Sequence, residues 1–238
     1  MFDPLYLAVS AIVRAWHVPL GLLFGPTSGV GWALAIVLLV VTLRAALLPL
    51  VLVQMRSARR SAALAPRIAQ LRERHAADPA RLLAEIRDLR RAEGVSMWGG
   101  LLPALAQLPV FLGLLHVLRT PATLGTDAAA FLAARLGDVP LTSWATMPQA
   151  LLDAAGATRP EVLLVAVPLL VLAGVATGLA LRASAAAAPA LRPLVRLAPA
   201  GVLAAGLLGP FPIAILLYWL VANLWTLAQQ RFLAAPSP

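Results

Sequence analysis

A single arginine stands inside an otherwise uncharged, apolar stretch of the sequence. Arg44 lies within residues 31–53, which contain no acidic side chain that could neutralise it. A guanidinium facing lipid would cost roughly 3 kcal/mol on insertion scales. We therefore expect Arg44 to face a water-filled cavity inside a helix bundle, where it could attract an acidic group. The alternative is that Arg44 extends to the membrane surface or bonds the carbonyls of a neighbouring helix.

A row of polar side chains near the carboxyl end could accompany this cation. Four residues spaced four, three and four apart share one helical face, namely Trp219, Asn223, Thr226 and Gln230. Amides that faced lipid would lack hydrogen-bond partners, so this face should turn toward the bundle interior, as Arg44 should. Gln107, between Pro103 and Pro109, is a further candidate. For Gln107 alone, an ordinary interhelical hydrogen bond is the preferred interpretation.

The composition places the chain in a membrane. Apolar residues make up 61% of the 238 residues and charged residues 12%, and the apolar runs approach bilayer-spanning length. There is no cysteine for a disulfide or thiolate metal site, and no lysine for a Walker A phosphate loop. The three histidines lie on different segments, and no common catalytic motif occurs. We expect no metal, no cofactor and no enzymatic activity.

Five candidate membrane spans follow one another along the chain. They are predicted at residues 31–53, 97–118, 162–181, 194–209 and 211–227. Pro210 and Pro212 break the last two apart and leave room only for a tight turn. Residues 1–29 carry no predicted cleaved signal, and their apolar spacing favours a helix that lies along the membrane surface. A short buried helix would give the same pattern.

The distribution of arginines predicts the orientation. Residues 56–96 hold ten arginines against five acidic residues, and residues 182–196 hold three against none. Both segments should be cytoplasmic. Residues 119–161, with three arginines against four acids, should form an external loop. The amino terminus is then outside and the carboxyl terminus inside. Because the net charge of +9 is gathered beside apolar spans, membrane topology explains it, and we expect no specific nucleic-acid binding.

Residues 56–96 contain two helical stripes of apolar side chains. The first consists of Leu64, Ile68 and Leu71, and the second of Leu82, Ile86 and Leu89. Asp78 and Pro79 separate the stripes, and this dipeptide is typical of a helix start. The pattern predicts an antiparallel, coiled-coil-like helical hairpin. The alternative is that the charges merely coat a solvated helical pair.

Four segments together resemble the YidC/Oxa family of membrane protein insertases, and the opening MFDPLYLAVSAIVRAWH with HVLRT after the second span further resembles its actinobacterial members. The four segments are TLRAALLPLVLVQMRSARRSAALAPRIAQL, DPARL, GVSMWGGLLPALAQLPVFLGLLHVLR and PFPIAILLYWLVANLWTLAQQRFL. The resemblance implies an all-α membrane protein with an insertase core at residues 30–238. Its five transmembrane helices would surround a hydrophilic groove that is open to the cytoplasm and to lipid but closed outside.

The resemblance also assigns residues to that groove. Arg44 matches the family's groove arginine, Gln107 falls in its proline-rich second span, and Tyr218, Trp219 and Asn223 match its fifth-span signature. With Thr226 and Gln230 from the polar row, these residues are the predicted substrate-binding groove. In the family, the third and fifth spans form the surface along which an entering segment slides.

The implied function is insertion of membrane proteins into a bacterial plasma membrane. The protein would capture apolar segments of nascent membrane proteins and translocate their short polar flanks, alone or with the Sec translocon. Nascent chains and the lipid bilayer are the expected partners, while SecYEG and the ribosome are left open. A static scaffold for membrane-protein assembly, which would not depend on Arg44, is the alternative.

Overall fold

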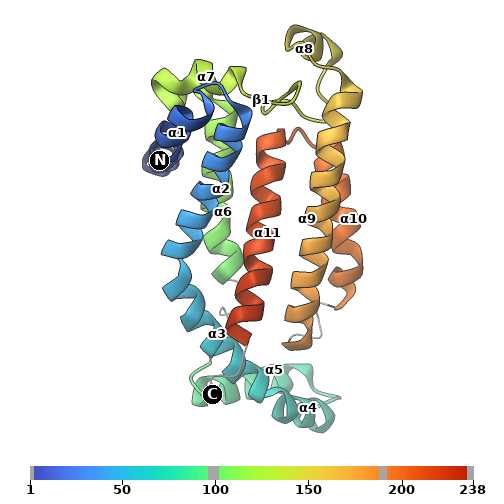
Figure 1. Ribbon diagram of the computed structural model, residues 1–238. Helices are drawn as coiled ribbons and strands as arrows, with labels where there is room; N and C mark the ends of the chain where they lie inside the picture. Colours follow the sequence, from blue (N-terminus) through green and yellow to red (C-terminus); the bar gives the residue numbers. More distant parts are fainter. Residues whose placement is uncertain (1–2, 96–101, 188–191, 235–238) are drawn as a thin grey trace. The chain divides into compact units, whose positions relative to one another are not determined.

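The computed structural model describes the backbone of residues 3–95, 102–187 and 192–234 (Figure 1). Over these residues the chain is helical apart from loops and one two-stranded antiparallel ribbon, so the predicted all-α membrane class is confirmed. The chain divides into two compact units. One comprises Met1–Ala45 together with Pro109–Pro238, and the other comprises Ala46–Leu108.

Within the described residues, four helices are long and apolar enough to cross a membrane. These segments are Tyr6–Phe24 of α1 (Asp3–Phe24), Gly29–Ala46, which is α2, Arg159–Arg182 of α9 (Arg159–Ala187), and Ile213–Phe232 of α11 (Ile213–Ala234). The predicted spans at 162–181, 194–209 and 211–227 correspond to α9, α10 (Arg192–Leu208) and α11, with the expected break at residues 209–212. The span predicted at 97–118 corresponds to α6 (Leu102–Arg119), and its residues 97–101 lie outside the described ranges.

The prediction of one continuous span over residues 31–53 is wrong. Helix α2 ends at Ala46, and a new helix, α3 (Leu48–Ala63), begins two residues later. Pro49 explains the break, because it has no N–H to donate to the Ala45 carbonyl and it disfavours helical geometry at the preceding residue. Arg44 consequently lies in the last turn of α2 and not in the middle of a span.

Helix α1 confirms the helical pattern read from the first residues of the chain. Val9 and Val13 are buried, whereas Leu7, Leu22 and Leu23 are exposed. The outer face of α1 is therefore apolar too, as lipid contact requires. The segment Tyr6–Phe24 is long enough to cross a membrane as well as to lie on one, so its position along the surface stays a prediction.

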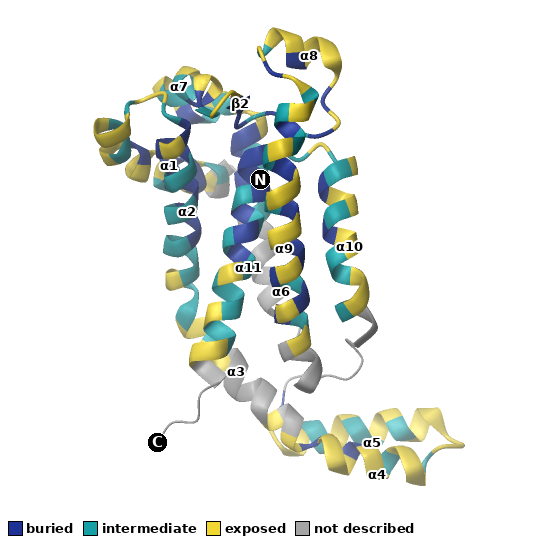
Figure 2. Cartoon of the chain, turned by 45° about the vertical axis from the view of Figure 1, so that its right-hand side comes forward, coloured by how far each residue is buried: buried dark blue, intermediate teal, exposed yellow. Residues whose placement is uncertain are grey.

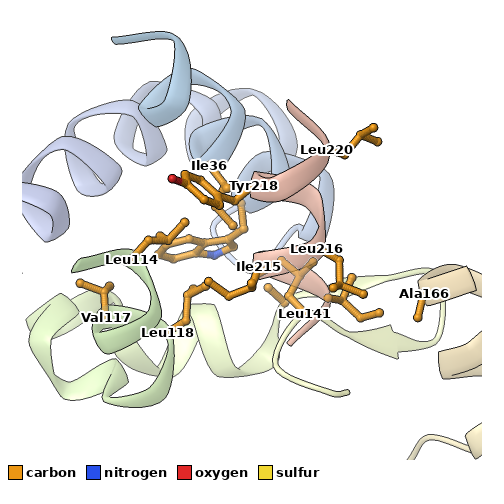
Figure 3. Packing of buried hydrophobic residues seen from close by; sticks show 14 of the residues in the cluster. Ile36, Leu114, Val117, Leu118, Leu141, Ala166, Ile215, Leu216, Tyr218 and Leu220 are labelled. Carbon is orange, nitrogen blue, oxygen red and sulfur yellow. The ribbon is translucent and has the colours of Figure 1, made fainter. Parts of the chain in front are cut away.

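The core of the larger unit forms around α9 and α11. Helix α9 packs against both α10 and α11 (Figure 1). A methyl group added at Gly174 of α9 would lie 3.2 Å from the Pro199 oxygen of α10, so the close approach of these helices requires the missing side chain. Figure 3 shows the apolar cluster that joins α2, α6 and α11, in which Ile36 lies beside Tyr218.

The segment predicted as an external loop folds into a structured cap. It contains the 3-10 helix η1 (Pro121–Asp127), helix α7 (Ala128–Ala133), strands β1 (Arg135–Leu136) and β2 (Val139–Pro140), and helix α8 (Gln149–Ala154). Its carbonyls accept hydrogen bonds from the first turn of α11, at 2.9 Å from Ile213 N to Ser143 O and 3.1 Å from Ala214 N to Leu141 O. The cap thereby satisfies N–H groups that a helix start leaves without intrahelical partners.

The smaller unit contains α3 and a helical hairpin, α4 (Ala65–Arg74) and α5 (Pro79–Ala92), shown in Figure 2. Ile68 packs against a small cluster that includes Ile86 and Leu89. The Asp78 carboxylate accepts a hydrogen bond from the Arg81 N–H at 3.0 Å, so the predicted helix start at Asp78 is confirmed. Because α3 continues to Ala63, the paired helices begin at Ala65 and not at residue 56.

Replacing Asp78 by alanine tests this helix start. The loss of a capping carboxylate costs about 1 kcal/mol, so we expect amide hydrogens in the first turn of α5 to exchange roughly fivefold faster. Hydrogen exchange of the full-length protein, followed by mass spectrometry, measures this. Asp88→Ala is the matched control, because Asp88 is an exposed residue in the middle of α5. Equal exchange in the two variants would contradict the capping role.

Candidate functional site

Arg44 lies in the contact between α2 and α11. Its Nη2 atom donates a hydrogen bond to the Ala222 carbonyl oxygen at 3.2 Å. Its Nε atom is buried and has no hydrogen-bond partner among the described residues. The guanidinium therefore does bond a neighbouring carbonyl, which was the alternative interpretation of the sequence, but that bond uses only part of its donor capacity. An acceptor supplied by water or by a bound chain could use the rest.

The Ala222 carbonyl is shared between two side chains. Thr226 Oγ1 donates to the same oxygen at 2.9 Å, so Arg44 and Thr226 meet at one acceptor. Asn223 Nδ2 donates to the Trp219 carbonyl at 2.8 Å, within α11 itself. The hydrogen bonds of Asn223 and Thr226 are therefore local, and neither residue needs a partner helix to satisfy the donor that it uses here.

Gln230 makes a contact with a different helix. Its Nε2 atom donates to the Ala180 carbonyl of α9 at 3.2 Å. The predicted polar row on α11 is thus divided, with Thr226 beside Arg44 and Gln230 beside α9. All four members of the row are half-buried, whereas Leu224, between Asn223 and Trp225, is 50% exposed. Trp225 and Gln229, outside the row, are half-buried too, so the direction that the row faces stays a prediction.

The two aromatic residues of the predicted groove are placed differently from each other. Tyr218 is 2% exposed and belongs to the apolar core (Figure 3). Its ring lies 6.1 Å from that of Phe111. Trp219 is half-buried and packs edge to face on Phe211 at 6.3 Å. Gln107 lies on α6, but its side chain is outside the described part of the structure. Its role stays a prediction.

A second row on α11 was missed by the sequence analysis. Ala222, Trp225 and Gln229 are spaced three and four apart, one step before the predicted row, and they share one helical face. Within the described residues, Trp225 Nε1 and Gln229 Nε2 are buried without hydrogen-bond partners, as is Arg44 Nε. Both rows have helical spacing, so the sequence alone did not distinguish the second row from the first.

Three buried N–H donors of α2 and α11, on Arg44, Trp225 and Gln229, have no acceptor among the described residues. Each such group costs about 1 to 3 kcal/mol unless an acceptor arrives. A carboxylate, a peptide carbonyl or water could supply one at Arg44, Trp225 and Gln229. No group of three His, Asp or Glu side chains that could hold a metal ion occurs in the described ranges.

These features define a class of protein, namely a multi-pass α-helical membrane protein with an arginine in the last turn of a membrane-capable helix. Comparison with known proteins makes the assignment particular. The family model described as 60Kd inner membrane protein matches residues 23–237. The chain belongs to this family, so the resemblance to YidC/Oxa insertases is confirmed, and the protein is a multi-pass bacterial membrane protein.

Individual relatives carry the name membrane protein insertase YidC. The protein from Mycolicibacterium paratuberculosis is 36% identical over 97% of this chain and 74% of its own length. The Mycobacterium leprae protein is 36% identical over 97% of this chain and 69% of its own. The Streptomyces avermitilis protein is 28% identical over the whole chain and 59% of its own length.

Proposed function

We propose that this protein captures apolar segments of nascent membrane proteins and translocates their short polar flanks past Arg44. The observation that carries the proposal is the Arg44 guanidinium between two membrane-capable helices, with a buried Nε that lacks an acceptor. The names of its relatives support the same function. A hydrophilic groove around Arg44, lined also by Trp219, Asn223 and Gln107, is part of this proposal.

The energetics require no ATP. A substrate helix of about 20 apolar residues gains roughly 6 to 12 kcal/mol on entering lipid. The barrier is the polar flank, because each charge costs roughly 3 kcal/mol near the bilayer centre. If water reaches the N–H donors within the membrane, the polar flank has a shorter thickness of hydrocarbon to cross. The Arg44 guanidinium would also attract a carboxylate in that flank. The favoured substrates are therefore short tails with few charges, preferably acidic ones, while long charged domains need the Sec channel.

The same proposal sets orientation and partners. The arginine distribution supports an external amino terminus and a cytoplasmic carboxyl terminus. Entering segments would slide along α9 and α11, and the protein would act alone or with SecYEG. Docking of a ribosome is left as a further partnership to test.

A static assembly scaffold is the second candidate function. The bond from Arg44 to Ala222 favours it, because this contact ties α2 to α11 without any substrate. A scaffold holds completed partner helices, whereas an insertase meets chains that are still being synthesised. The two functions therefore differ in when, and with what, the site makes contact.

Site-specific photocrosslinking from position 219 tests the proposal. During synthesis of a small single-span protein with a short acidic tail, we expect adducts between position 219 and arrested nascent chains. A crosslinker at Leu22, an apolar residue of α1 that is 86% exposed, controls for chance encounters within the membrane. Equal adduct yields at the two positions, or adducts at 219 only with completed proteins, would favour the scaffold.

A further inference from the structure

The hairpin of α4 and α5 separates its charges onto two sides. The helices run antiparallel, since Arg67 pairs with Glu93 at 2.7 Å and His75 contacts Glu85 at 3.0 Å. The apolar row between the helices contains Leu64, Ile68, Ile86 and Leu89, which belong to one cluster. Leu71 and Leu82 continue the same helical spacing and are half-buried, and we call these six residues the packed row. Residues that precede the packed row lie on one side of the pair, and residues that follow it lie on the other.

The side that precedes the packed row has balanced charge. We name it the ion-pair face, and its charged members are Arg67, Arg74, Arg81, Glu85 and Asp88. Arg81 Nε lies 3.4 Å from Glu85, four residues further along α5. The three arginines of this face are thus accompanied by the carboxylates of Glu85 and Asp88. A further carboxylate, that of Glu93, is paired with Arg67.

The opposite side is strongly basic. We name it the arginine face, and its members are Arg72, Leu83, Arg87, Arg90 and Arg91. Leu83, Arg87 and Arg91 follow one another at four-residue spacing along α5. Two acidic residues adjoin members of this face in sequence, Glu73 beside Arg72 and Asp88 beside Arg87.

The donors of the arginine face have few acceptors among the residues that the structure describes. Arg72, Arg87 and Arg91 are exposed and make no ion pair with any of the described residues. Arg90 is half-buried, and its Nε has no partner in that part of the chain. Leu83, in the same row, is 63% exposed. The face therefore combines four guanidinium groups with an exposed apolar side chain.

We propose that the arginine face binds the phosphate headgroups of anionic phospholipids, with Leu83 entering the interfacial layer. Basic side chains near an anionic surface each contribute binding free energy, and a guanidinium bonds phosphate oxygens in bidentate fashion. An apolar residue amid the arginines suits the boundary between headgroups and acyl chains. Glu85 and Asp88 belong to the ion-pair face and Glu93 is paired with Arg67, so three of the acidic residues of the hairpin are held away from this contact.

A bilayer fits this face better than nucleic acid for two reasons. A phosphate backbone would bond the arginines but offers no apolar layer to Leu83, which would remain exposed. The hairpin is also joined closely to a membrane-capable helix, α2. Between α2 and α4 the chain forms only α3, which has 16 residues and is about 24 Å long. Such a tether keeps the local concentration of headgroups high.

Labelled full-length protein in nanodiscs tests the proposal. The chain has no native cysteine, so a nitroxide can be placed at Ala80→Cys, in the row of Leu83 and Arg87, or at Ala92→Cys, in the row of Glu85 and Asp88. We expect the label at position 80 to become accessible to oxygen and protected from a water-soluble nickel reagent in discs with about one third phosphatidylglycerol. In phosphatidylcholine discs it should stay aqueous, and the label at position 92 should stay aqueous in both.

Two triple variants with equal charge change supply the decisive comparison. R72Q/R87Q/R91Q should lower the ratio of docked to undocked hairpin on the order of 100-fold, at roughly fivefold for each arginine. R67Q/R74Q/R81Q, on the ion-pair face, should leave docking largely intact. Equal losses in both variants, or immersion that does not depend on phosphatidylglycerol, would overturn the proposal. The proposal would also be overturned if R72Q/R87Q/R91Q kept the label at position 80 immersed in the bilayer but no longer sedimented with 70S ribosomes, because nucleic acid would then be the partner of the arginine face.

Discussion

Arg44→Ala is expected to lower translocation of a short tail carrying one acidic residue by about 100-fold, with little effect on an uncharged tail of the same length. The reason is electrostatic. A guanidinium about 5 Å from a carboxylate, at an effective dielectric near 20, contributes roughly 3 kcal/mol by Coulomb's law. This is comparable to the cost of one carboxylate near the bilayer centre. Arg44→Lys should retain most of the effect on the acidic tail, because it keeps the charge while losing the planar fork.

Protease protection of the tail after synthesis into proteoliposomes measures this effect. Arg196→Ala, which removes an exposed arginine from α10, is the matched control and should translocate both tails normally. The hydrogen bond to Ala222 makes a second comparison necessary. If Arg44→Ala impaired acidic and uncharged tails equally, the arginine would act by holding α2 against α11, and charge capture would be refuted.

Trp32→Ala should cause the largest loss of stability, about 3 to 5 kcal/mol. The Trp32 side chain is 0% exposed and stacks on His17 with ring centroids 3.7 Å apart. It also meets Phe131 edge to face at 5.1 Å, and its Nε1 donates to the Pro26 carbonyl at 3.1 Å. Truncation would leave a cavity where α1, α2 and α7 meet and would remove the donor to that carbonyl.

Thermal unfolding in nanodiscs, followed by circular dichroism, compares this variant with Trp16→Ala. Trp16 is 37% exposed and donates to Thr42 Oγ1 at 3.0 Å, so its truncation removes a hydrogen bond but creates no enclosed cavity. We expect the melting temperature to fall several times further for Trp32→Ala. Similar melting temperatures for the two variants would show that the α1–α2–α7 contact contributes little to stability.

The sequence by itself determined the membrane class, the helical segments and several of their ends. Apolar runs of bilayer length require helices, because backbone N–H and C=O groups in lipid must bond within the segment. Asp78 and Pro79 specified the start of α5, since a cap acts on N–H groups within three residues. The break at Pro49 was also local, but the apolar composition continues across it, and hydropathy alone does not register a missing N–H.

Only the tertiary structure decided what Arg44 touches. Its acceptor, the Ala222 carbonyl, is 178 residues away and belongs to a residue whose side chain carries no polar group. Helical spacing identified a polar row on α11, but it did not show that Trp225 Nε1 and Gln229 Nε2, outside that row, are buried without partners among the described residues. The cap formed by Leu141 and Ser143 on α11 was likewise invisible, because it uses backbone carbonyls. Side-chain patterns can be read from the sequence. Every residue, however, has the same backbone carbonyl acceptor, so only the packing of the helices determines which carbonyl Arg44 contacts.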